Sequence, residues 1–228
     1  MHAKPRLVTS RPRQLTIPLA SPPLHTRAAF VESAANTQAL ALLDRWPAWP
    51  GAVLALVGPE GAGKTHLATI WAAEAGAAAW APGDDLAAPA GKPVLVEDAD
   101  QAGDEALFHL INRAPIDGGL LLTARTRPTA WTAALPDLRS RLNALTVAEI
   151  GEPDDALLIA VLEALFREKL HRPAPDLYAY LLRRMPRSVA AAREMVRRLD
   201  QAAGEQGRPL NRVLAREVLD ETADLFGE

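Results

Sequence analysis

Residues 58–65 of the chain, Gly-Pro-Glu-Gly-Ala-Gly-Lys-Thr, decide its fold. They follow the apolar run Ala52–Val57, which predicts a strand, and they lead into the alanine-rich segment Lys64–Ala75, which predicts a helix. A glycine-rich turn in this position directs backbone N–H groups toward phosphates, while Lys64 reaches the outer phosphates and the Thr65 hydroxyl ligates magnesium. The sequence therefore predicts a P-loop that binds ATP or ADP with Mg²⁺. Its predicted nucleotide-binding residues include Gly58, Gly61, Ala62, Gly63, Lys64 and Thr65.

Short apolar runs alternate with helical segments on both sides of the P-loop. Continuous apolar strands separated by helices are typical of a parallel sheet that helices cover on both faces. We therefore predict an α/β fold of the P-loop αβα sandwich type. The expected strands are Ala52–Val57, Ala77–Trp80, Pro93–Val96, Gly119–Thr123 and Leu145–Glu149, and the expected helices are Ala34–Leu43, Lys64–Ala75 and Glu105–Arg113.

The pattern becomes helical only after Gly151. Pro153 and two acids suit a first helical turn, and apolar residues then recur on one face. Further helices are expected at Asp176–Met185, at Ser188–Ala203 and from Leu210 onward. We expect an extended, proline-containing tail over residues 1–26, a nucleotide-binding domain over 27–151 and a small helical lid domain over 152–228.

Composition excludes several classes of site. The 228 residues carry a net charge of −3 and contain no cysteine, so global charge gives no argument for nucleic-acid binding and disulfides are excluded. No apolar run approaches the roughly 20 residues that a membrane span needs, and the histidines lack metal-ligand spacing. We expect a cytoplasmic protein with no membrane partner and no metal site built from protein ligands alone.

Two acids follow the strand predicted at Pro93–Val96. A P-loop enzyme needs carboxylates at the tip of a neighbouring strand to hold magnesium and orient water, and Glu97 and Asp98 occupy that place. With Thr65, Glu97 is the predicted magnesium contact. Common arrangements place aspartate first and the catalytic glutamate second, whereas this chain has the reverse order. We therefore expect nucleotide binding with weak intrinsic hydrolysis; the competing interpretation of the pair is a solvated strand end.

Polar and basic residues follow the two acids at the ends of predicted elements, in a fixed order along the chain. Thr123 ends an apolar strand, Leu138-Arg139-Ser140-Arg141-Leu142 precedes the last strand, and Met185-Pro186-Arg187-Ser188 opens a lid helix. This succession resembles the AAA+ ATPases. The resemblance implies that Thr123 is the first sensor, Arg141 the arginine finger and Arg187 the second sensor. Arg139 is the rival finger; Arg141 is preferred because serine-arginine followed by an apolar residue is the family pattern.

The resemblance narrows to the core of the replication initiator DnaA. It rests on Phe30-Val31 and Asn36 ahead of the P-loop, on Gly63-Lys64-Thr65-His66-Leu67, and on Ser140-Arg141-Leu142. It adds His66 to the predicted nucleotide-binding residues. We expect no DNA-binding helix-turn-helix domain beyond the lid. Such a core resembles the Hda family, the regulators that inactivate DnaA.

The tail carries the hexapeptide Gln14-Leu15-Thr16-Ile17-Pro18-Leu19. Alone, it favours a strand or an apolar patch that packs on the core. Hda proteins carry a similar motif just ahead of the AAA+ core, and it docks on the β sliding clamp. The resemblance therefore implies clamp contacts by a glutamine side chain, aliphatic anchors and a proline that lowers the ordering cost. The predicted clamp-binding residues are Gln14, Leu15, Ile17, Pro18 and Leu19.

Together these resemblances imply a protein that stimulates hydrolysis of DnaA-bound ATP by supplying Arg141, with ADP in its own P-loop. The expected partners are DnaA, the β sliding clamp of DNA polymerase III and, through the clamp, DNA; a homo-oligomer is compatible with the sequence. One alternative is an energy-consuming ATPase subunit of the clamp-loader or helicase-loader type. Another is a nucleotide-gated adaptor that docks on the clamp without affecting the initiator.

Overall fold

The computed structural model describes residues 25–226 of the chain. Its centre is a five-stranded sheet in the order β2-β3-β4-β1-β5, in which every neighbouring pair is parallel. The strands are β1 (Val53–Val57), β2 (Ala78–Trp80), β3 (Val94–Val96), β4 (Leu120–Ala124) and β5 (Thr146–Glu149). Because parallel strands end at the same edge of the sheet, the segments that follow β1, β3 and β4 are brought together there.

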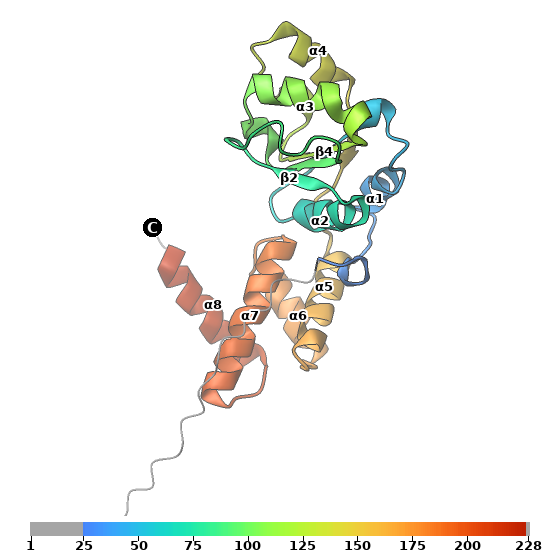
Figure 1. Cartoon of the computed structure of the whole chain (residues 1–228). Helices are drawn as coiled ribbons and strands as arrows, with labels where there is room; N and C mark the ends of the chain where they lie inside the picture. The colour runs from blue at the N-terminus through green and yellow to red at the C-terminus, as the bar shows by residue number, and fades with distance from the viewer. Residues whose placement is uncertain (1–24, 227–228) are drawn as a thin grey trace, which may run out of the picture.

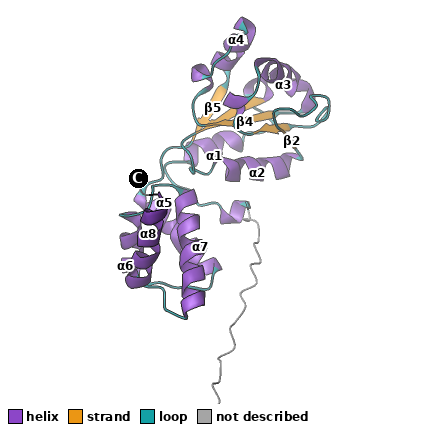
Figure 2. Ribbon diagram, turned by 90° about the vertical axis from the view of Figure 1, so that its left-hand side faces the viewer, coloured by secondary structure: helices purple, strands orange, loops and turns teal. Residues whose placement is uncertain are grey.

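Helices cover both faces of the sheet (Figures 1 and 2). Alternate residues of β1 point to opposite faces: Ala55 packs with α3 and α4, whereas Leu54 and Leu56 pack with α1 and α2. These helices are α1 (Thr37–Leu43), α2 (Lys64–Ala75), α3 (Asp104–Asp117) and α4 (Pro136–Ala144). The predicted αβα sandwich is confirmed.

The second half of the chain is helical and has its own apolar core. Its helices are α5 (Asp155–Glu168), α6 (Pro175–Leu182), α7 (Val189–Gln206) and α8 (Arg212–Phe226). Side-chain caps fix three of their starts: Asp154 accepts a hydrogen bond from the Leu157 amide (2.7 Å), Ser188 from the Ala191 amide (3.0 Å) and Asn211 from the Leu214 amide (3.1 Å). Figure 2 shows this group below the sandwich, on the side where α1 and α2 cover the sheet. The core residues of the group include Leu158, Leu162, Phe166, Leu181, Leu199 and Leu214.

Among the described residues, the structure adds one α-helix that the sequence analysis did not assign. Residues 138–142 lie inside α4, which begins at Pro136 and buries Leu138 and Leu142 against the sheet. In addition, α3 extends past Arg113 to Asp117, with Pro115 in its last turn. Within residues 25–226, no helix has both the length and the apolar character needed to cross a membrane.

Candidate nucleotide-binding site

The P-loop connects the end of β1 to the start of α2. The Gly58 amide donates a hydrogen bond to the Ala124 carbonyl (3.3 Å), which holds the loop beside the end of β4. Gly61 and Gly63 have left-handed backbones with φ of 71° and 105°, so glycine is the residue that adopts these conformations without strain. Gly63 is also the N-cap of α2, and the open end of that helix therefore faces the loop.

Lys64 is buried in the first turn of α2. Its ammonium donates hydrogen bonds to the carbonyls of Gly58 (2.8 Å) and Pro59 (2.9 Å). Burial lowers the pKa of Lys64, while the nearby carboxylate of Asp98 acts in the opposite direction. A cation enclosed by its own loop can exchange these carbonyls for phosphate oxygens, which stabilise the charge more strongly.

The predicted magnesium-side residues lie together at the carboxyl edge of the sheet. The Asp98 amide donates a hydrogen bond to Thr123 Oγ1 (3.3 Å), and Thr123 is only 2% exposed. Asp98 has a left-handed backbone, and the side chains of Glu97 and Asp98 are both exposed. The structure thus joins the tips of β3 and β4 through a buried hydroxyl while leaving the two carboxylates open to a ligand.

These residues fit a nucleoside phosphate with magnesium. The evidence for the fit is a close-packed glycine cradle, in which a Cβ added at Gly58 would lie 2.5 Å from the Ile150 carbonyl oxygen. The cradle leads to a buried lysine, and the exposed Thr65 hydroxyl group follows it on α2. Among the described residues, no cluster of three or more histidine, cysteine or acidic side chains could hold a metal by itself. Magnesium would therefore be held jointly by Thr65, the acids and the phosphates.

An ion pair missed by the sequence analysis lies at the same edge. Arg125 follows β4 directly and contacts the P-loop residue Glu60, with 3.0 Å between Nη1 and Oε2. The Arg125 charge also acts on Lys64, where it lowers the pKa of the ammonium. The signal was present in the sequence as a cation two residues after Thr123, but only the register of β1 and β4 shows that it reaches the P-loop.

Aromatic rings pack beside the P-loop, where a Cβ added at Gly63 would lie 3.7 Å from the Phe30 ring. The His66 ring is 5.0 Å from that of His25 and 5.3 Å from the edge-on ring of Phe30. His66 Nε2 lies 3.0 Å from the Thr26 carbonyl oxygen, and a carbonyl can only accept, so this nitrogen carries a hydrogen. Burial lowers the pKa of His66 despite this bond. The predicted residue His66 therefore belongs to a packed aromatic wall beside the P-loop.

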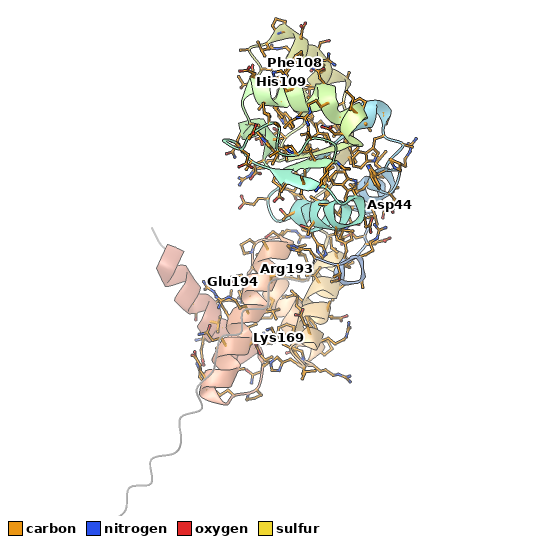
Figure 3. All side chains as sticks on the ribbon, viewed as in Figure 1. Asp44, Phe108, His109, Lys169, Arg193 and Glu194 are labelled. Carbon is orange, nitrogen blue, oxygen red and sulfur yellow. The ribbon has the colours of Figure 1, made fainter. Side chains whose placement is uncertain are left out.

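The helical group α5–α8, which is the predicted lid, contacts the P-loop through the start of α7. The Val189 amide donates a hydrogen bond to the Gly61 carbonyl (3.0 Å), and a Cβ at Gly61 would lie only 2.7 Å from Ser188 Cβ. Arg187 turns toward the start of α5, where it contacts Asp155 (2.7 Å) and the Pro153 carbonyl (3.3 Å). Figure 3 labels Arg193 on the end of α7 next to the sandwich, and its charge acts on His25 and His66.

The two candidate finger arginines on α4 have different surroundings. Arg139 donates a hydrogen bond to the Ala133 carbonyl in the preceding loop. Arg141 is exposed and lies over the ring of Phe108, with 5.2 Å from its guanidinium carbon to the ring centre. Figure 3 labels Phe108 on α3 close to α4. Since α4 and α2 cover opposite faces of the sheet, Arg141 is not brought together with Lys64. The predicted clamp-binding residues, Gln14 to Leu19, lie outside the described residues.

No family model matches the chain. Its structure is similar to domain III of the replication initiation protein DnaA from Thermotoga maritima, with a TM-score of 0.72 and 15% identity, covering 87% of this chain and 97% of that one. It is also similar to AMPPCP-bound DnaA from Aquifex aeolicus, with a TM-score of 0.67 and 18% identity, covering 86% of this chain and 70% of that one. A RuvB variant from Thermotoga maritima has a TM-score of 0.63 and 18% identity, covering 80% of this chain and 65% of that one. These similarities show that the chain has a DnaA-like AAA+ fold.

Proposed function

We propose that this protein is an Hda-type regulator of replication initiation. It docks on the β sliding clamp of DNA polymerase III, which tethers it to DNA, and stimulates hydrolysis of the ATP bound to DnaA. The product is inactive DnaA-ADP. The DnaA-like AAA+ fold supports the class of protein, and the exposed Arg141 on α4 is the observation that carries the regulatory role.

Arg141 is suited to act on a nucleotide held by another protein. It belongs to the helix on the sheet face opposite α2, so it cannot reach a nucleotide bound to Lys64 of the same chain without rearrangement of the core. Its guanidinium is exposed, and the ring of Phe108 directs it without neutralising its charge. An arginine supplied in trans stabilises the charge that develops on the transferred phosphoryl group, which raises hydrolysis on the order of 10³ to 10⁵-fold in such systems.

The chain's own nucleotide has a structural role in this proposal, with ADP as the active ligand. Lys64 and Thr65 hold its phosphates and magnesium, His66 flanks them, and the lid follows the P-loop through the Gly61–Val189 hydrogen bond. Arg187 acts as second sensor by moving from Asp155 to the nucleotide. Because the Asp155 side chain is exposed, breaking this ion pair costs little. The reversed order of Glu97 and Asp98 makes intrinsic hydrolysis weak.

The test follows radiolabelled ATP preloaded on DnaA in the presence of clamp assembled on DNA. We expect the wild-type protein to accelerate conversion to ADP only when the clamp is present. Arg141→Ala removes the finger, and Gln14→Ala weakens clamp docking, so each variant loses acceleration. Arg139→Ala is the matched control on the same helix and keeps it. If wild-type protein that binds the loaded clamp fails to accelerate conversion, the regulatory role is refuted and a clamp-docking adaptor remains.

The energy-consuming ATPase of clamp-loader or helicase-loader type is the second candidate. The hydrogen bond from the Asp98 backbone amide to the Thr123 hydroxyl favours it, because this bond holds the Asp98 residue beside that hydroxyl, and a hydroxyl and a carboxylate at neighbouring strand tips are components of a hydrolytic site. It predicts steady-state ATP turnover by the isolated protein that DNA stimulates and that Asp98→Asn removes. The regulatory proposal predicts that the isolated protein turns over ATP far more slowly than an ordinary ATPase. It also predicts that the Asp98→Asn variant stimulates hydrolysis of DnaA-bound ATP as well as wild type does.

A further inference from the structure

The ion pair between Arg125 and Glu60 joins the tip of β4 to the P-loop. β1 and β4 are paired so that Val57 lies opposite Ala124, which places the next residue, Arg125, beside the first P-loop glycine. The pair is open to solvent, with side-chain exposures of 62% for Arg125 and 75% for Glu60. An ion pair as exposed as this contributes little to stability, because water screens it and two flexible side chains must be ordered.

The position of the pair matches the outer-phosphate side of the site. A P-loop holds the inner phosphates with its backbone and reaches the outer ones with its lysine. The charges of Arg125 and Asp98 both act on Lys64 in opposite directions: Arg125 lowers the pKa of its ammonium, and Asp98, which follows the neighbouring strand β3, raises it. The rings of His66 and His25 meet the charge of Arg193 from α7, and His25 also meets the charge of Glu97. Arg125 approaches the P-loop from the tip of β4, where Glu60 and Lys64 meet its charge.

A phosphate is a better partner for Arg125 than Glu60 is. The planar guanidinium forms two parallel hydrogen bonds with phosphate oxygens, and a terminal phosphate carries more negative charge than one carboxylate. When Arg125 moves to the phosphate, the carboxylate of Glu60 loses its cation and lies beside an anionic ligand. Glu60 thus competes with the ligand for Arg125 and raises the cost of moving it.

We propose that Arg125 leaves Glu60 to contact the terminal phosphate of a nucleoside triphosphate, so that the Arg125–Glu60 pair sets the preference of the P-loop between ATP and ADP. With ADP the pair stays intact, because the diphosphate lacks the group that Arg125 would reach. This inference rests on the nucleotide binding of the proposed function. It concerns which nucleotide the site retains, independently of Arg141 and DnaA.

The test measures dissociation constants of fluorescent ATP and ADP analogues for the full chain with magnesium. We expect Arg125→Ala to weaken ATP binding by about tenfold and ADP binding by less than about twofold, since one charge-assisted phosphate contact is lost. Glu60→Gln should tighten ATP binding, by about threefold, because it frees Arg125 and removes a competing negative charge. Arg125→Lys keeps the charge without the planar fork and should fall between wild type and the alanine variant.

Arg127→Ala is the matched control. Arg127 lies two residues further on the same segment and pairs with Glu149 of β5 rather than with a P-loop residue, so both affinities should stay at the wild-type level. Thermal unfolding without nucleotide verifies that each variant is folded. Equal weakening of ATP and ADP by Arg125→Ala, or no weakening of either, overturns the inference while leaving nucleotide binding intact. Failure of the wild-type chain to bind either nucleotide more tightly than Lys64→Ala overturns both the inference and the nucleotide binding on which it rests.

Discussion

Arg141 of α4 lies over the ring of Phe108 of α3, with 5.2 Å between the guanidinium carbon and the ring centre. The arginine is exposed and the ring is half-buried. Phe108 also packs against the core between α3 and the sheet, so the core holds the ring in place. The ring in turn restricts the orientation of the Arg141 side chain through the cation–π contact. Arg141 is thus a cation whose direction the fold sets and whose charge remains available to a partner.

Phe108→Leu keeps an apolar side chain but removes the ring. We expect stimulation of DnaA-bound ATP hydrolysis to fall by about two- to fivefold, because an exposed cation–π contact contributes about 0.5–1 kcal/mol to holding Arg141 in place. Phe108→Tyr retains the ring and should behave like wild type. The assay is the rate of ADP formation on DnaA. Equal rates for the leucine and tyrosine variants would show that the ring does not direct Arg141.

Gly61→Ala should separate the lid from the P-loop. The new Cβ would lie 2.7 Å from Ser188 Cβ, and φ at Gly61 is +71°, so both space and backbone oppose it. We expect ADP binding to weaken by about tenfold as the Gly61–Val189 hydrogen bond is lost. Fluorescence titration with an ADP analogue measures this.

Gly76→Ala provides the control for backbone strain. Gly76 has a similar φ of +62°, but no atom lies within 4 Å of an added Cβ. It should lower stability by about 1 kcal/mol and leave ADP affinity unchanged. A Gly61→Ala variant that binds ADP as tightly as Gly76→Ala would argue against coupling between lid and P-loop.

The two histidines beside the P-loop make stability depend on pH. Burial, followed by the charge of Arg193, lowers the pKa of His25, and burial lowers the pKa of His66 below the usual 6.5. Below about pH 6.5 the unfolded chain therefore binds more protons than the folded chain, and stability falls as the pH decreases. We expect a lower melting temperature at about pH 5.5 than at about pH 7.5.

Other groups also titrate in this range, so a variant is needed to isolate the histidines. His66→Gln retains a donor for the Thr26 carbonyl but does not titrate. The decrease in melting temperature on acidification should be smaller for this variant than for wild type. An identical decrease in both proteins would mean that His66 contributes nothing to the pH dependence.

The sequence predicted most of what is local in this fold. The P-loop and α2, from Lys64 to Ala75, follow from residue types that only a strand-turn-helix accommodates. Sequence did not predict α4, although Pro136 at its first turn and Leu138 and Leu142 one turn apart are helix signals. A short segment of low apolar content gives weak periodicity, and here its burial against the sheet stabilises the helix.

Contacts between distant segments were beyond sequence reasoning. A parallel sheet was expected, but the order β2-β3-β4-β1-β5 depends on how crossover helices pack, and local patterns do not encode that. The same order places Arg125 beside Glu60, 65 positions earlier in the chain. The start of α7, outside the sheet, places Ser188 against Gly61. The positions of these residues in the sequence do not identify their partners.

The most direct test of the central claim is the single-turnover rate constant for ATP hydrolysis on DnaA, with clamp loaded on DNA and this protein in excess. We expect Arg141→Ala to lower this rate constant by about 10²-fold or more relative to wild type, down to the rate of DnaA alone, while Arg139→Ala stays at the wild-type rate. A wild-type rate with Arg141→Ala would contradict it, because the arginine finger would then have to come from elsewhere.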